Sequence, residues 1–284
     1  MERVIFGDNQ FFGVNHGSDE KSRAQAIRFK DNKAIIDVLD IAIEEGINTF
    51  MCTTHDRIAD ICKVIRDNPK YKGFKIYPCM PYAHKYANAV TELGIMGTIK
   101  QYVPGNIFST VAKGGMAFVK KDFISMMDLL IDAELKMFKG IDTPVIFIQN
   151  VITDMLLGLG MTDFLVGFYE HVRDKHKAEA GFITMNLPLL LDTLEGAGIK
   201  NPIICASINK AGFRMSGSVA EYEKVIAQKR CRLIAMQVFA AGTLAPKEAL
   251  EYVCKLDGVE SILFGASSRG NIRQSKQMID SLSK

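Results

Sequence analysis

Two short polar runs carry residue types that exchange protons near neutral pH. His55 and Asp56 stand together in the run CTTHDR at 52–57, and His84 and Lys85 stand together after the next apolar run. A histidine beside a charged neighbour suits general acid–base catalysis, because its ordinary pKa lies close to neutrality. For His55 and Asp56 the competing interpretation is a helix start, at which Asp56 would favour the positive end of the helix dipole. We predict that these four residues are catalytic.

Other side chains permit covalent or metal chemistry. Lys210 follows an apolar run, and a lysine facing an apolar site can lose its proton and form a Schiff base with a carbonyl substrate. The alternative for Lys210 is a solvated charge on a loop. His16 and Cys52, with Asp8 and the histidines above, could supply metal ligands. No compact ligand motif such as HExxH is present, so a divalent metal is the weaker expectation. His171 and His176 stand in a charged helical segment and are expected at the surface.

The segment GASSR at 265–269 carries the clearest signal for an anion. Gly265, Ser267 and Ser268 are small or hydroxylic, and Arg269 follows them just before the last helical segment. Free backbone N–H groups at a helix start favour an anion, and an arginine can bind phosphate through two parallel hydrogen bonds. The alternative is a serine-capped helix with a surface arginine. We predict a phosphate site here.

Eight short apolar runs, each followed by a helix-period segment, must position these residues. The strands are expected at 4–6, 47–52, 74–79, 145–149, 182–185, 203–208, 233–239 and 261–264. Continuous apolar strands alternating with helices indicate a parallel sheet covered by helices. The count of eight, without an early GxGxxG, favours a closed (β/α)8 TIM barrel over an open doubly wound sheet. In such a barrel, reactive groups come from the carboxyl ends of the strands, where the candidates above fall.

Composition limits the possible partners. The 284 residues, 48% hydrophobic and 24% charged, fit a single barrel domain over 1–284, with an insert at 94–140 that could be a lid or an interface. A net charge of +3 is too small to predict binding to nucleic acid or a membrane. The chain has six scattered cysteines, no secretory signal and no apolar run of membrane-spanning length, so we expect a cytoplasmic location. The oligomeric state is left open.

Several of these motifs resemble the aldo-keto reductase superfamily over most of the chain. GINTF at 46–50 and MQVFAAGTL at 236–244 look like the segments around that family's second and seventh strands. FGASS at 264–268 is similar to the segment that holds the cofactor phosphate, and Asn186 matches the asparagine that contacts the nicotinamide amide. The resemblance implies a TIM barrel that binds NADP through Asn186 and the residues that follow the eighth strand.

The catalytic tetrad of that family is not kept. Its aspartate falls on Met51, its tyrosine on Asp56, its lysine near Cys79 or Met80, and its histidine on Gln149. Tyrosine donates the proton as hydride reaches the carbonyl, so the family mechanism lacks its donor here.

Three functions follow from this combination. The first is acid–base chemistry of the lyase, epimerase or aldolase type on a phosphorylated or nucleotide-linked small molecule such as a sugar. The alternative is a divergent NAD(P)H-dependent oxidoreductase that reduces a carbonyl, with Asp56 or His55 as proton donor. A non-catalytic binding protein ranks last, because it would not need the titratable cluster.

Overall fold

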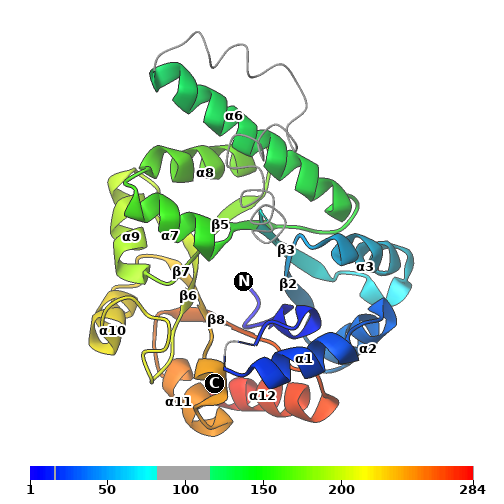
Figure 1. Cartoon of the computed structure of the whole chain (residues 1–284). Helices are drawn as coiled ribbons and strands as arrows, with labels where there is room; N and C mark the ends of the chain where they lie inside the picture. The colour runs from blue at the N-terminus through cyan, green and yellow to red at the C-terminus, as the bar shows by residue number, and fades with distance from the viewer. Residues whose placement is uncertain (16, 82–115, 284) are drawn as a thin grey trace.

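Eight parallel strands form a closed barrel in chain order, with β8 paired to β1 (Figure 1). The computed structural model describes residues 1–15, 17–81 and 116–283. The strands are β1 (Val4–Gly7), β2 (Thr49–Thr53), β3 (Lys75–Met80), β4 (Val145–Ile148), β5 (Glu179–Thr184), β6 (Ile203–Ser207), β7 (Arg232–Met236) and β8 (Val259–Phe264). The predicted TIM barrel is confirmed.

Helices surround the barrel (Figure 1). They are α1 (Asp19–Arg28), α2 (Asn32–Glu44), α3 (Asp56–Asp67), α6 (Met116–Leu135), α7 (Asn150–Gly158), α8 (Thr162–His176), α9 (Leu187–Gly196), α10 (Val219–Ala227), α11 (Pro246–Cys254) and α12 (Arg269–Leu282). Short 3-10 turns occur at η1 (Asn9–Phe12), η2 (Pro69–Tyr71), η3 (Lys136–Phe138) and η4 (Ala240–Gly242). Within the described ranges, no helix has both the length and the apolar character needed to cross a bilayer.

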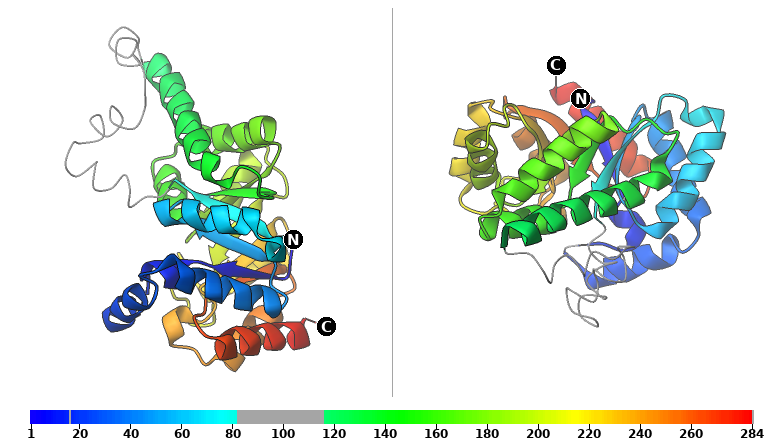
Figure 2. Two further views of the ribbon diagram at one scale, coloured as in Figure 1. Left: turned by 90° about the vertical axis from the view of Figure 1, so that its right-hand side faces the viewer. Right: turned by 90° about the horizontal axis from the view of Figure 1, so that it is seen from above.

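Part of the predicted insert is a helix of the barrel. α6 precedes β4 and packs against α8, and one of its ends projects beyond the ring of helices (Figures 1 and 2). The sequence places a helix at 122–139, whereas the observed helix is Met116–Leu135. A lid or interface role for 94–140 stays a prediction.

Alternate residues of the strands belong to two separate cores. One set fills the barrel interior: Ile5, Met51, Tyr77, Cys79, Val145, Phe147, Ile183, Ile203, Cys205 and Ile234. The other set packs against the helices, whose apolar residues recur at three- and four-residue spacing, as at Ile58, Ile61 and Ile65 of α3. Because both faces are covered, the strands are nearly continuous apolar runs.

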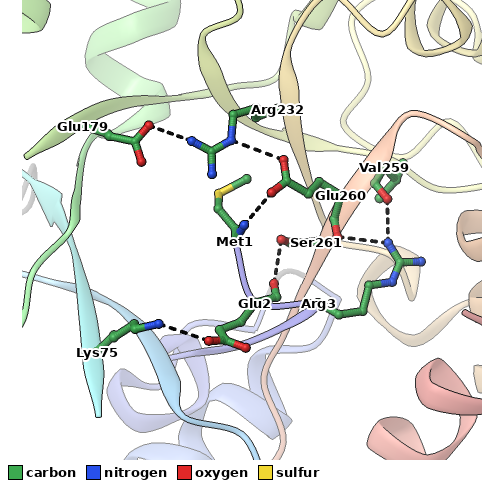
Figure 3. A network of polar contacts seen from close by, with 9 residues as sticks. All are labelled: Met1, Glu2, Arg3, Lys75, Glu179, Arg232, Val259, Glu260 and Ser261. Atoms are coloured by element: carbon green, nitrogen blue, oxygen red, sulfur yellow. Dashed lines mark hydrogen bonds and ion pairs between the residues drawn. The ribbon is translucent and has the colours of Figure 1, made fainter. Parts of the chain in front are cut away.

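Charged groups close the amino-terminal end of the barrel (Figure 3). The Met1 amine lies 2.5 Å from Glu260 Oε1. Arg232 bridges Glu260 at 3.4 Å and Glu179 at 2.6 Å. Burial alone would raise the pKa of Glu260, but hydrogen bonds from the amine and Arg232 hold it below its ordinary value. With this end occupied by ion pairs, the candidate site is the opposite end, where active sites of such barrels lie.

Candidate active site

Asp8 is a buried carboxyl group at the carboxyl ends of β1 and β2. It is only 6% exposed. Its Oδ2 accepts hydrogen bonds from the backbone N–H of Thr53 at 2.7 Å and from the Thr53 hydroxyl at 2.8 Å. Burial raises the pKa of Asp8 and outweighs the lowering effect of the Thr53 hydrogen bonds. Such a group holds its proton to a higher pH than an exposed aspartate, which suits a general acid.

Two cysteines lie near Asp8. Burial, and then the negative charge of Asp8, raise the pKa of Cys52 and Cys79 well above the ordinary value of a thiol. Both are therefore protonated thiols at neutral pH, which are poor nucleophiles. Cys52 also packs in the core between barrel and helices, which gives no support to a metal-binding role, and that role stays a prediction.

His55 is placed by the start of α3. It is the N-cap residue, and its Nδ1 accepts a hydrogen bond from the Arg57 N–H at 3.1 Å. Its ring stacks on Phe12, with centroids 4.3 Å apart and planes 14° from parallel. Burial lowers the pKa of His55, which favours the neutral ring. Asp56 follows in the first turn. The helix-start interpretation therefore accounts for this pair, and a role for either residue in proton transfer stays a prediction.

Lys210, the predicted catalytic lysine within the described residues, gives no support to a catalytic cluster. Lys210 is exposed, and its Nζ lies 2.8 Å from Glu248 Oε1. This pairing raises the pKa of Lys210, the opposite of what Schiff-base formation needs, so the structure does not support that role, which stays a prediction. His16, His84 and Lys85 lie outside the described residues.

The predicted phosphate-binding arginine is already paired. Arg269 forms ion pairs with Glu44 and Glu45, which stand at the carboxyl-terminal end of α2. Hydrogen bonds from Arg269 and from Lys70 lower the pKa of Glu44 to about 2. Ser268 caps α12 by accepting a hydrogen bond from the Asn271 N–H at 3.3 Å. The observed arrangement is that of the alternative interpretation, a serine-capped helix with a surface arginine, and phosphate binding by Ser267, Ser268 and Arg269 stays a prediction.

Gln10 covers the start of the same segment. A Cβ atom on Gly265 would lie 2.1 Å from Gln10 Oε1, so the glycine is required for this contact. Gln10 is buried, and its Nε2 donates to the Gly7 carbonyl at 2.7 Å. The carbonyl of Ser267 accepts a hydrogen bond from Arg28. An anion that approached Gly265 would first have to displace the Gln10 amide.

The opposite side of the mouth, at β6 and β7, carries uncharged hydrogen-bonding groups. The buried Ser207 hydroxyl donates to Gln237 Oε1 at 3.0 Å and also lies 3.0 Å from the sulfur of Met185. Gln237 has a left-handed backbone, with φ of 54°, which is unusual outside glycine. Such conformations often occur at functional sites. Ser207 was missed by sequence reasoning, because a serine at the end of an apolar strand carries no distinctive pattern.

Asn186 stands at the end of β5. Its Oδ1 accepts a hydrogen bond from the Leu189 N–H at 3.3 Å, which caps α9. Nearby, Asp154 accepts hydrogen bonds from the Thr184 hydroxyl at 2.5 Å and from the Met185 N–H at 3.0 Å. Burial raises the pKa of Asp154 despite these bonds. Asn186 is thus fixed at the mouth, and its contact with a cofactor stays a prediction.

Comparison with solved structures identifies the fold. A Pseudomonas aeruginosa protein assigned to the aldo-keto reductases matches with a TM-score of 0.60 and 12% identity, over 100% of this chain and 91% of that chain. An aldo-keto reductase from a Medee basin deep-sea metagenome library matches with a TM-score of 0.52 and 12% identity, over 90% and 89%. A mutant of Gox0644 in complex with NADPH matches with a TM-score of 0.50 and 6% identity, over 100% and 89%. No protein-family model and no curated protein matches the chain.

The chain therefore has the fold of the aldo-keto reductases, as its sequence motifs suggested. The described mouth combines the buried carboxyl group of Asp8 at β1 and β2 with hydroxyl and amide groups at β5 to β7. A second, half-buried carboxyl group, that of Asp154, is bound to Thr184 and Met185 beside β5. Asp8 can hold or release a proton, and the hydroxyl and amide groups can bind an uncharged polar group.

Proposed function

We propose that this chain is a divergent oxidoreductase that reduces a small carbonyl compound with NADPH, with Asp8 as the proton donor. The observation that carries the proposal is the burial of Asp8 at the mouth, which raises its pKa. Asp8 then replaces Asp56 and His55, the donors suggested by the sequence. NADPH, when bound, supplies the hydride.

The side chains at β5 to β7 fit the carboxamide end of such a cofactor. A carboxamide needs both hydrogen-bond donors and acceptors, and hydroxyl and amide side chains offer both. Ser207, Gln237 and Asn186 would hold that group. The segment after β8 fits the phosphates less well, because Arg269 is paired with Glu44 and Glu45. The NADPH complex of a protein with the same fold supports the cofactor assignment.

Thr53 would orient the proton donor. Its N–H and hydroxyl both bind Oδ2 of Asp8, which holds that oxygen in place. A protonated Asp8 can give its proton to the oxygen of a carbonyl substrate as negative charge develops there. After transfer, the two Thr53 hydrogen bonds stabilise the carboxylate until it is protonated again.

A titration of NADPH and the Asp8→Asn variant test this proposal. We expect NADPH to bind the wild-type chain and to be consumed with at least one member of an aldehyde and ketone panel. Asp8→Asn should lower kcat about 10²–10⁴-fold, the usual contribution of a positioned acid, and leave NADPH affinity unchanged. The matched control is Asp60→Asn, which removes an exposed carboxylate of α3 that pairs with Lys63. The proposal fails if NADPH does not bind, or if Asp8→Asn keeps wild-type turnover.

A second candidate is cofactor-independent acid–base chemistry on a phosphorylated sugar. It is favoured by the presence of Met51, Asp56 and Gln149 at the tetrad positions. Hydride transfer in the resembling family depends on the tetrad residues that these three replace. It predicts conversion of a sugar phosphate without NADPH, with turnover lost in Asp8→Asn.

A further inference from the structure

A cluster of histidines and aspartates lies on the outside of the barrel, where α6 packs against α8 (Figure 1). It joins Asp132 of α6 to His171 and His176 of α8. The side chains are 19%, 10% and 22% exposed, so they are mostly covered. This corrects the expectation that both histidines are ordinary surface residues. The proposed reaction at the mouth uses none of the three.

The cluster has the size of a zinc site. Oδ1 of Asp132 lies 2.9 Å from Nε2 of His171 and 2.8 Å from Nε2 of His176. One ligand atom from each residue lies within 4.8 Å of the other two. A tetrahedral Zn²⁺ with bonds of about 2.0–2.1 Å holds its ligand atoms roughly 3.3 Å apart. Small side-chain movements would therefore admit the ion.

A second carboxylate lies at the other nitrogen of the His171 ring. Nδ1 of His171 lies 3.3 Å from Oδ1 of Asp128, a buried atom that makes no hydrogen bond. If Nε2 binds a cation, Nδ1 can donate to this oxygen. Carboxylate–histidine–metal contacts of this kind are usual around zinc.

The charges of the cluster also favour a cation. Asp128 and Asp132 bring two negative charges, and Lys175 brings one positive charge that contacts Oδ2 of Asp132. With neutral histidines the group carries one net negative charge. Lys175 contacts Oδ2 of Asp132, whereas the other oxygen, Oδ1, faces the two histidines. Two imidazoles and one carboxylate suit Zn²⁺ rather than Mg²⁺ or Ca²⁺, which prefer all-oxygen sites.

We propose that Asp132, His171 and His176 bind one Zn²⁺, that Asp128 orients His171, and that the ion fastens α6 to α8. Water would complete the tetrahedron. The site lies on the outer wall at the carboxyl-terminal ends of both helices, so its role is structural. Because its residues differ from those of the proposed active site, each proposal can fail without the other.

Zinc titration of the full chain after chelator treatment tests the site. We expect one Zn²⁺ per chain by calorimetry and only nitrogen and oxygen neighbours by zinc-edge X-ray absorption. His176→Gln and Asp132→Asn should abolish this binding, and Asp128→Asn should weaken it about 10–100-fold, the usual cost of losing an outer-shell partner. Asp174→Asn is the matched control, since Asp174 lies on the same helix, exposed and paired with Arg173.

Thermal unfolding gives a second measurement. Zn²⁺ should raise the Tm of the wild-type chain and of Asp174→Asn but not that of His176→Gln, whose fold is checked by circular dichroism. Absence of stoichiometric binding would overturn the proposal and leave the cluster as a network of hydrogen bonds and ion pairs. Sulfur neighbours in the absorption spectrum would also overturn it, since they would place the ion on cysteines. Equal zinc binding by Asp132→Asn and by the wild-type chain would also overturn the proposal.

Discussion

Replacement of Gly181 by alanine should strain the barrel interior. Gly181 of β5 is the register partner of Phe147 of β4. A Cβ atom on Gly181 would lie 2.3 Å from Cε1 and 2.4 Å from Cδ1 of the Phe147 ring. Phe147 is fully buried, and its ring centroid lies 6.0 Å from that of Tyr77. The ring therefore cannot move away without disturbing its neighbours.

The expected cost follows from this overlap. Overpacking of a well-filled core costs about 1–3 kcal/mol of unfolding free energy. With an unfolding entropy of about 2.1 cal/mol/K per residue, that corresponds to a Tm lower by roughly 2–5 °C for a chain of this length. The matched control is Gly196→Ala at the end of α9, where nothing lies within 4 Å of the added Cβ. Alanine in a helix is favoured over glycine by about 0.5–1 kcal/mol, so this variant should gain stability.

Calorimetry of four variants measures the effect: Gly181→Ala, Phe147→Leu, the double variant and Gly196→Ala. Leucine at 147 lacks the ring, so the double variant should lose less stability than the sum of its two single changes. An unchanged Tm in Gly181→Ala, or strict additivity in the double variant, would refute the steric argument.

Three further predictions concern charge and burial. Because the folded-state pKa of Asp8 is raised, the wild-type chain should lose unfolding free energy as pH rises from about 4 to that pKa. Asp8→Asn should not show this loss. Denaturant titrations across pH measure both. Arg232→Met removes a partner of both Glu179 and Glu260 and should cost about 1–2 kcal/mol of unfolding free energy, less at high salt, in the same titrations. Burial raises the pKa of Cys62 and Cys231 to about 12, so iodoacetamide at pH ~8 should modify both only after unfolding, as mass spectrometry would show.

The barrel was predictable because its signal is local. The runs at 145–149 and 203–208 are continuous and apolar, and β4 (Val145–Ile148) and β6 (Ile203–Ser207) occupy them almost to the residue. Gln149 leaves the strand because it becomes the N-cap of α7. A buried parallel strand needs only its own side chains to be recognised, and its partners follow from chain order.

The candidate site was less predictable because it depends on distant partners. The local sequence around Arg269 fits phosphate binding. However, Arg269 pairs with Glu44 and Glu45, which are more than 200 residues away in the chain. The five-residue spacing of His171 and His176 is not a helical facing pattern, and Asp132 comes from another helix. For Asp8 the residue type was visible, but its burial beside Thr53 was not.

The ion pairs around Arg232 and Glu260 have a consequence for how this chain tolerates mutation. They secure the strands at the end of the barrel opposite to Asp8 and Ser207. The side chains at the carboxyl ends of the strands can therefore change while the opposite end preserves the architecture. Stability and chemistry are thus controlled by different residues, so new side chains can be introduced around Asp8 without collapse of the scaffold.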